Sequence, residues 1–183
     1  AGLPIPGTVI EIVSLDDPHL LVATGEKGEI CVTGPQVMQD YWMQKEESET
    51  ALEDGRLHTG DVGHIDEDGY VFISDRIKDL IITGGFNVYP KEVEDCLNQL
   101  PGVKESAVIG VPHPDFGEAL VALIAGEENT VPSEQTVITA LKRNLAGFKV
   151  PRRIIRLDAL PKNAMGKVQK NTLRETYADV IKN

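Results

Sequence analysis

The sequence has few of the residues that build disulfide networks, metal centres or membrane spans. Its 183 residues include two cysteines, Cys31 and Cys96, which lie far apart and form no Cys-x-x-Cys pair. That spacing alone gives no disulfide framework and no zinc site, and a reduced, cytoplasmic setting is expected. No apolar run approaches the ~18 residues that a membrane helix needs, so we expect no membrane span.

Positive charge is also scarce. The chain carries 18 Lys and Arg against 29 Asp and Glu, a formal net charge of −11. Nucleic acid would be repelled at long range, so no nucleic-acid partner is expected. The glycine-rich phosphate loops of the Walker and Rossmann types are absent. Residues 1–7 have neither a basic start nor the apolar core of a signal peptide, and because they also lack Met we expect a piece of a longer polypeptide.

What is present is typical of a soluble globular protein, with 41% hydrophobic and 26% charged residues. The first part of the chain reads as short β-branched strands separated by Gly, Pro and Asp, with a hairpin at Asp66-Glu-Asp-Gly69. The expected strands are Thr8–Val13, Glu29–Thr33, Val62–Ile65 and Tyr70–Ser74, with a short helix at Lys45–Leu52.

From about Asp75 the pattern changes to alternating helices and strands. Pro90 suits the first position of a helix, Ser133 suits an N-cap, and a last helix carries its apolar face at Leu173, Tyr177, Val180 and Ile181. Expected strands are Lys78–Thr83, Glu105–Val111, Glu118–Ala125 and Arg153–Leu157, the last three forming a sheet. We therefore predict an α+β fold: a small β-rich, distorted barrel-like subdomain in residues 1–75, then a compact domain in residues 76–183 with a three-stranded sheet and packed helices.

Two segments near this boundary carry polar groups suited to a nucleotide. In Leu57-His-Thr-Gly-Asp61, the carboxylate can accept two hydrogen bonds from a vicinal diol such as a ribose. In Asp75-Arg-Ile-Lys-Asp79, Arg76 can donate to a phosphate or ribose oxygen, and Lys78 can mark a hinge. Taken singly, a Gly-Asp turn and a solvated strand edge explain them at least as well.

Two further segments suggest a backbone that a ligand can approach closely and a lysine on a mobile loop. In Thr83-Gly-Gly-Phe-Asn-Val-Tyr-Pro90, two glycines let backbone approach a ligand or turn sharply. In Leu160-Pro-Lys-Asn-Ala-Met-Gly-Lys167, Lys167 is expected on an exposed loop freed by Gly166, from which an ammonium can offset charge in phosphoryl transfer. A plain turn and a solubilising surface lysine are the alternatives.

Together and in this order, these four segments resemble the adenylate-forming (AMP-binding) superfamily, which includes acyl-CoA synthetases, firefly luciferases and peptide-synthetase adenylation domains. The resemblance covers essentially the whole chain. The run from Asp75 to Glu94 is similar to the CoA-ligase version, while Glu105–Gly117 and Asn163–Asn171 are most similar to malonyl-CoA synthetases.

The resemblance implies a role for each matching residue. Asp61 would hold the ribose hydroxyls of ATP and AMP, Arg76 would contact the nucleotide, and Lys78 would be the hinge. Lys167 would reach the acid carboxylate and the α-phosphate, and its acylation would switch the enzyme off. The residues expected to serve coenzyme A are Gly84, Gly85 and Asn87 on the pantetheine route and, less directly, Lys149.

The implied activity is that of an AMP-forming acid:CoA ligase using ATP, Mg²⁺ and coenzyme A, with malonate as the expected acid. A medium- or long-chain fatty acid, a carrier-protein acceptor and a non-catalytic regulatory module are the alternatives. The phosphate loop and acyl pocket belong to an N-terminal domain absent from this sequence. Residues 1–75 would be that domain's last subdomain, residues 76–183 the mobile C-terminal domain, and the chain alone is expected to be inactive.

Overall fold

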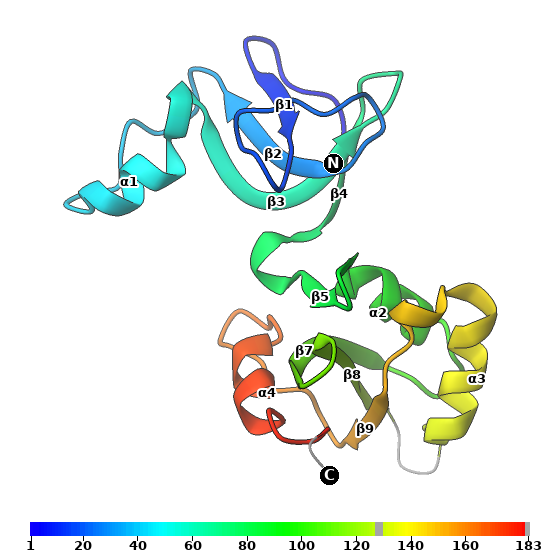
Figure 1. Ribbon diagram of the computed structural model, residues 1–183. Helices are drawn as coiled ribbons and strands as arrows, with labels where there is room; N and C mark the ends of the chain where they lie inside the picture. Colours follow the sequence, from blue (N-terminus) through cyan, green and yellow to red (C-terminus); the bar gives the residue numbers. More distant parts are fainter. Residues whose placement is uncertain (127–129, 182–183) are drawn as a thin grey trace. The chain divides into compact units, whose positions relative to one another are not determined.

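The computed structural model describes residues 1–126 and 130–181, which form two compact units. The first, the strand-rich unit, runs from Ala1 to Lys78, and the second, the C-terminal unit, begins at Asp79 (Figure 1). Among the described residues, no helix is both long and apolar enough to cross a membrane.

The strand-rich unit is built on one antiparallel sheet of four strands in chain order, β1-β2-β3-β4. Its strands are β1 (Val9–Val13), β2 (Gly28–Thr33), β3 (Leu57–Ile65) and β4 (Val71–Arg76). Register shifts interrupt the ladder on both sides of β3. Such irregularities bend a strand, and Figure 1 shows β3 curving beneath β1 and β2.

The expected hairpin and short helix of this unit are both found. Asp66–Gly69 forms the turn between β3 and β4, with the Asp66 and Tyr70 backbones hydrogen-bonded across it. Helix α1 (Lys45–Ala51) lies between β2 and β3, followed by a 3-10 turn at Glu53–Gly55. The sheet gives this unit its small core, made of Ile12, Val13, Ile30, Cys31, Val62 and Val71.

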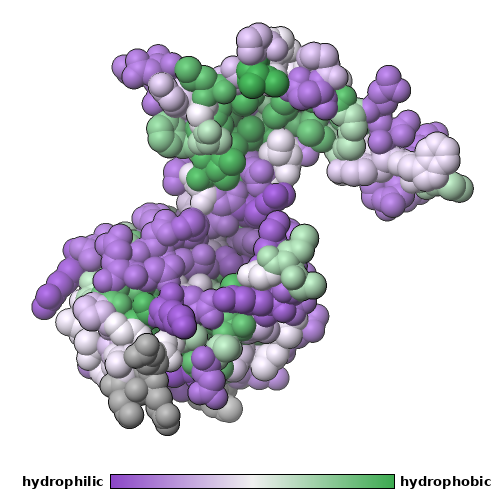
Figure 2. Space-filling model, turned by 180° about the vertical axis from the view of Figure 1, so that it is seen from behind, coloured by the Kyte–Doolittle hydropathy of each residue, from purple (hydrophilic) through white to green (hydrophobic). Residues whose placement is uncertain are grey.

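Much apolar surface of the strand-rich unit faces solvent. Figure 2 shows these side chains gathered over one face. A soluble monomer rarely exposes a large continuous apolar patch unless something binds there. The large exposed apolar residues of this unit include Leu3, Ile5, Val9, Leu20, Leu21, Phe72 and Ile73.

The C-terminal unit has a sheet in the order β6-β5-β8-β7, with β9 joined in parallel to β8. Its strands are β5 (Ile81–Thr83), β6 (Phe86–Val88), β7 (Glu105–His113), β8 (Gly117–Ala125) and β9 (Arg153–Leu157). The helices are α2 (Pro90–Asn98), α3 (Glu134–Asn144) and α4 (Lys170–Thr176).

Both faces of the central β7–β8 pair are buried, which explains why β8 is apolar almost throughout. Because side chains alternate along a strand, Leu120, Ala122 and Ile124 pack with the α2 and α3 side chains. Val121 and Leu123 point the other way, into a cluster that includes Leu173 of α4. Figure 1 shows α4 on one side of the sheet and α3 on the other.

Three sequence predictions about this unit are corrected. The sheet has five strands, because the short hairpin of β5 and β6 joins the three expected ones. The strand predicted at Lys78–Thr83 begins only at Ile81, since residues 77–79 form a 3-10 turn. The last helix ends at Thr176 because Tyr177 leaves helical geometry, although Val180 and Ile181 still pack against the core.

The helix starts follow the sequence signals. Pro90 occupies the first turn of α2, and the Ser133 hydroxyl accepts a hydrogen bond from the Thr136 amide at 3.2 Å as the N-cap of α3. Helix α3 buries Val137 and Leu141 against the sheet. The cap therefore fixes where a core-packing helix begins.

Substituting Ser133→Ala is expected to lower the free energy of unfolding by about 1 kcal/mol, because the Thr136 amide loses its acceptor. The measurement is urea unfolding of the chain. Thr139→Ala is the matched control, since that exposed hydroxyl only bonds the Gln135 carbonyl within the helix. An equal loss of stability in both variants would contradict the capping role.

Candidate active-site segments

Asp61 and Arg76 face each other across the β3–β4 ladder and form an ion pair, with Arg76 Nε 2.7 Å from Asp61 Oδ1. The Asp61 side chain is 23% exposed and that of Arg76 54%, so the pair stands at the surface. The arginine orients the carboxylate through one oxygen. Strand pairing thus brings together two residues that the sequence predicted for nucleotide binding.

The backbone beneath Asp61 is held by side chains of its own strand and of β2. The Asp61 amide donates to Thr59 Oγ1 at 3.1 Å, and that hydroxyl donates to the Ile30 carbonyl at 2.7 Å. The Gly60 amide donates to Glu29 Oε1 at 2.9 Å, and Gly60 has a φ of +69° that favours glycine. These contacts fix the direction in which Asp61 leaves the sheet.

Lys78 lies exposed in the 3-10 turn of Ile77–Asp79, at the last residue of the strand-rich unit. A short 3-10 turn between two compact units can act as a hinge, because its φ and ψ angles can change without disturbing either core. The hinge role of Lys78 remains a prediction.

Gly84 and Gly85 form the two-residue turn between β5 and β6, with φ values of +56° and +82°. Positive φ at both central positions is the requirement of a tight hairpin turn, which glycine meets without strain. The Gly84 amide donates to the Phe116 carbonyl at 2.9 Å, while Asn87 is exposed on β6. The turn explains the glycines structurally and also leaves bare backbone at the surface.

A cavity of about 420 Å³ within the C-terminal unit is bordered by Gly84. Phe86 and Phe148 stack on its wall with ring centroids 4.6 Å apart. Arg152 lies over the Phe116 ring at 4.5 Å. The cavity therefore combines aromatic surfaces with a cation, a composition that suits an amphipathic ligand bearing phosphate.

Lys149 does not point freely at this cavity. Its ammonium binds both carboxylate oxygens of Glu92, at 2.6 and 2.7 Å, which compensates its charge. It lies 5.8 Å from the Phe148 ring centroid. Among the cations of this unit, Lys142 and Arg152 line the cavity, and sequence reasoning had not named either of them.

Lys167 lies exposed on the loop between β9 and α4. The loop is ordered around Asn163. Its Oδ1 accepts from the amides of Met165 at 3.0 Å and Lys167 at 2.9 Å, and its backbone bonds to the Lys167 carbonyl and the Gly166 amide. Gly166 provides a φ of +78° for the turn. The glycine thus closes a hydrogen-bonded turn rather than loosening the loop, and the lysine side chain is presented outward from a defined backbone.

Residues 92–167 match the family model of the AMP-binding enzyme C-terminal domain. This segment belongs to that domain family. The matched range begins at Glu92 in α2 and ends on Lys167 itself. Within this family, the predicted roles of the site residues become specific hypotheses about an adenylating enzyme.

The sequence similarity to known proteins extends over the whole length of this chain. A long-chain-fatty-acid–CoA ligase of Salmonella typhimurium is 43% identical over 182 residues, which are 100% of this chain and 32% of that protein. The fatty acid–[acyl-carrier-protein] ligase ScoC of Streptomyces coeruleorubidus is 40% identical over 97% of this chain and 34% of its own length. This chain therefore spans about a third of the curated relatives that it matches.

The fold also matches a solved structure. ATP-bound MatB from Rhodopseudomonas palustris superposes with a TM-score of 0.93 at 46% identity, covering 98% of this chain and 36% of that one. The predicted mixed fold and the predicted resemblance are both confirmed. The roles of Asp61, Arg76, Lys78 and Lys167, and of the residues assigned to coenzyme A, stay predictions.

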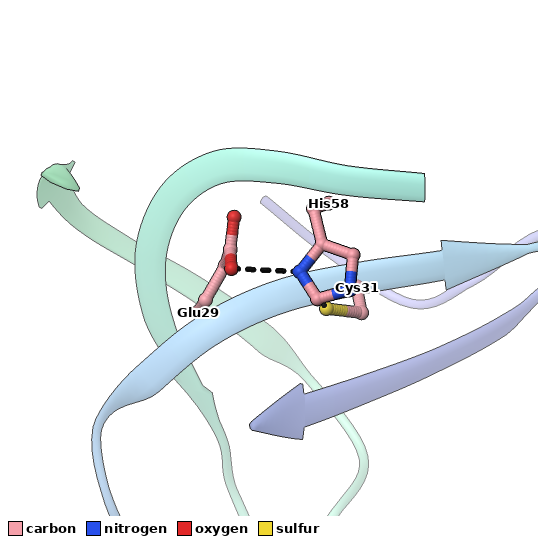
Figure 3. Close-up of side chains that lie close together, drawn as sticks. All are labelled: Glu29, Cys31 and His58. Atoms are coloured by element: carbon pink, nitrogen blue, oxygen red, sulfur yellow. Dashed lines mark hydrogen bonds and ion pairs between the residues drawn. The ribbon is translucent and has the colours of Figure 1, made fainter. Parts of the chain in front are cut away.

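Sequence reasoning missed one polar cluster in the strand-rich unit. Cys31 and His58 are direct partners in the β2–β3 ladder, and Glu29 lies beside them (Figure 3). The signal was available only through pairing, because these residues lie up to 29 positions apart in sequence. Burial, followed by the nearby Glu29 charge, raises the pKa of the Cys31 thiol to about 12.

The two cysteines differ in exposure, which predicts that a thiol reagent will distinguish them. Cys31 is 1% exposed, whereas Cys96 is partly exposed and buries less of its thiol. Burial, then the charges of Glu92 and Asp95, also raise the pKa of the Cys96 thiol, so the selectivity rests on access. At pH 8, an uncharged disulfide reagent is expected to modify Cys96, while Cys31 reacts only after unfolding. Peptide mapping of the labelled protein is the measurement. Equal labelling of both thiols in the folded chain would contradict the burial of Cys31.

Proposed function

We propose that this chain is the C-terminal part of an ATP-dependent acid:CoA ligase that forms acyl-CoA, AMP and pyrophosphate through an acyl-adenylate. The observation that supports it most is the bare Gly84–Gly85 turn beside an aromatic cavity with Arg152. A thiol carried on a long phosphorylated arm needs close backbone approach near its thiol end and cations near its phosphates. The 43% identity to a CoA ligase over the whole chain supports the same assignment.

In the first half-reaction, the acid carboxylate attacks the α-phosphorus of ATP and pyrophosphate leaves. Asp61 accepts hydrogen bonds from the ribose hydroxyls with its carboxylate, which Arg76 orients. Lys167 brings its ammonium to the oxygens on which negative charge develops. Mg²⁺ accompanies the ATP phosphates, and no residue of this chain is assigned as its ligand.

In the second half-reaction, the thiol of coenzyme A attacks the acyl carbonyl and AMP leaves. The Gly84–Gly85 turn and Asn87 border the route of the pantetheine arm, and Lys149 is the weaker candidate because Glu92 already compensates its charge. The two half-reactions need different groups at one centre, so a rotation about Lys78 exchanges the Lys167 loop for the glycine turn.

The strand-rich unit is proposed to be the last β-rich subdomain of the N-terminal adenylation domain. Its exposed apolar side chains, such as Phe72 and Ile73, support this, because such a surface suits burial against a neighbouring body. That neighbour would supply the phosphate loop and the acyl pocket. The chain alone would then be inactive, and the whole enzyme would act in the cytoplasm.

The acid is proposed to be malonate, on the resemblance of the 105–117 and 163–171 segments to malonyl-CoA synthetases. A medium- or long-chain fatty acid is the alternative, supported by the long-chain-fatty-acid–CoA ligase relative. Acylation of Lys167 would remove its charge and switch off the first half-reaction.

A carrier-protein thiol is a second candidate acceptor, because the ligase ScoC, whose name gives an acyl-carrier protein as acceptor, is 40% identical. The test is an assay of the enzyme that contains this chain, with ATP, a panel of acids, and either coenzyme A or a holo carrier protein. The proposal expects thioester on coenzyme A, with AMP formed in equal amount. Thioester on the carrier protein alone would reassign the acceptor.

A non-catalytic regulatory module is the remaining alternative. Calorimetric titration of ATP into this chain tests the ligase proposal against a module that binds nucleotide by itself. The ligase proposal places most nucleotide contacts in the absent domain. We expect no detectable binding at ATP concentrations below about 1 mM. Sub-millimolar binding by the chain alone would contradict the need for the N-terminal domain.

A further inference from the structure

Three donor groups of different chemistry meet in the strand-rich unit. His58 Nδ1 lies 2.9 Å from Glu29 Oε2 and 3.5 Å from Cys31 Sγ, and the three donor atoms all lie within 4.8 Å of one another. Figure 3 shows the Glu29 carboxylate and the Cys31 thiol close to the His58 imidazole, with the carboxylate bonded to the ring. Nitrogen, sulfur and oxygen donors in one cluster are the ligand set of a zinc-class cation.

The spacing suits such an ion. With metal–sulfur and metal–nitrogen bonds of about 2.3 and 2.0 Å, tetrahedral ligands lie roughly 3.3–3.6 Å apart. The 3.5 Å between Cys31 Sγ and His58 Nδ1 falls in that range. The 2.9 Å between Nδ1 and Glu29 Oε2 is a hydrogen-bond distance, so the carboxylate has to move outward by less than about 1 Å.

One hydrogen on His58 Nδ1 cannot satisfy all three groups of the cluster, whereas a metal ion can. His58 Nδ1 has one position for hydrogen, yet it faces both the carboxylate and the thiol. If Nδ1 carries the proton, it can donate to Glu29 but cannot accept from Cys31. If Nδ1 is bare, its lone pair opposes the carboxylate oxygen. A metal ion accepts from all three groups at once.

The cluster is mostly buried, and it opens to solvent on the side of a cavity. The side chains of His58 and Glu29 are 11% and 14% exposed, and both line a cavity of about 660 Å³. Cys31 lies behind them at 1% exposure. Glu46 and Glu47 line the same cavity and favour entry of a cation. Arg56, a positive charge that acts on Cys31, is compensated by Glu11 at 3.4 Å.

Glu29 is also held in place from behind. Its other oxygen, Oε1, accepts from the Gly60 amide at 2.9 Å, which anchors the carboxylate at one oxygen while Oε2, the oxygen that has to move, faces the imidazole. Supporting hydrogen bonds of this kind orient metal ligands.

We propose that Glu29, Cys31 and His58 form a binding site for a zinc-class divalent cation, with the fourth position open to the adjoining cavity. The Cys31 S–H bond breaks as the sulfur binds the metal as a thiolate, and the proton is released to solvent through the adjoining cavity. Glu29 also supports the backbone next to Asp61 through the Gly60 amide, but the metal site uses neither the Asp61 nor the Arg76 side chain, and it does not depend on the proposed ligase activity.

The test uses tag-free protein with this sequence, stripped of metal with a chelator and titrated with Co²⁺. We expect one equivalent to bind, with a thiolate-to-cobalt charge-transfer absorption and the visible bands of tetrahedral cobalt. Zn²⁺ should remove both signals by competition. Absence of the charge-transfer band, or a signal that keeps growing over several weak equivalents, would overturn the proposal.

The variants assign the signal to named residues. Cys31→Ser should abolish the charge-transfer band, and His58→Asn, which can retain a hydrogen bond to Glu29, should weaken binding at least about 10-fold. Cys96→Ser is the matched control and should leave the titration unchanged. Loss of the band in Cys96→Ser, or its survival in Cys31→Ser, would contradict the site. Circular dichroism checks folding, and if Cys31→Ser is unfolded the His58→Asn result decides.

Discussion

Replacing Lys167 by alanine in the enzyme that contains this chain will slow acyl-adenylate formation by about 100- to 1000-fold, the usual cost of losing one group that stabilises developing charge. The side chain is exposed and its loop is held through Asn163, so the substitution removes the ammonium without disturbing the backbone. Pyrophosphate exchange measures this half-reaction. Thioester formation from supplied acyl-adenylate should change by less than about threefold, because the proposed mechanism gives Lys167 no role in that step.

Lys162→Ala is the control for this prediction. Lys162 lies on the same loop, but it pairs with Glu105 at 2.5 Å. Its removal should leave both half-reactions near the unmodified rates. If Lys167→Ala slows both half-reactions equally, the lysine supports structure or general binding, and its assignment to adenylation is wrong.

Gly85→Leu will give the opposite pattern, with thioester formation reduced by about 100-fold or more and pyrophosphate exchange largely kept. A Cβ at Gly85 meets no heavy atom within 4 Å, so a side chain there projects into the space proposed for the pantetheine arm. A leucine that fills this route displaces the reacting thiol, and misplacement by about 1 Å can cost ~100-fold. The measurement is thioester formation from supplied acyl-adenylate and coenzyme A.

The strain at this position needs a separate control, because Gly85 has a φ of +82°. Gly55→Leu is matched to it, since Gly55 has a φ of +74° and also has no neighbour within 4 Å. Both variants should lose similar stability, of order 1–2 kcal/mol. If Gly55→Leu blocks thioester formation as strongly as Gly85→Leu, strain rather than obstruction explains the effect.

The sequence predicted the elements whose signals are local. Ser133 and Pro90 marked helix starts because capping and proline geometry act within one turn. The apolar run of β8 predicted a buried strand for the same reason. The sequence analysis missed β6, because three residues after a glycine turn are too few to show an alternation of apolar and polar residues. Only pairing with β5 makes Phe86–Val88 a strand.

The site was predictable to the extent that its residues are neighbours in sequence. The Gly84–Gly85 turn and the exposed Lys167 loop are short segments, and their placement follows from local chemistry. The pairing of Cys31 with His58 depends on the β2–β3 register, and the Lys149–Glu92 ion pair joins residues 57 positions apart. Contacts of that kind follow from tertiary packing, which no local pattern specifies.

The central claim is that the acid carboxylate attacks the α-phosphorus of ATP, and isotope transfer tests it most directly. The enzyme that contains this chain is incubated with ATP, coenzyme A and an acid whose carboxylate carries two ¹⁸O atoms, and the AMP is analysed by mass spectrometry. The account predicts AMP with one ¹⁸O, because the bridging oxygen of the acyl-adenylate leaves with the phosphate. Unlabelled AMP, or ¹⁸O found in inorganic phosphate together with ADP, would contradict it.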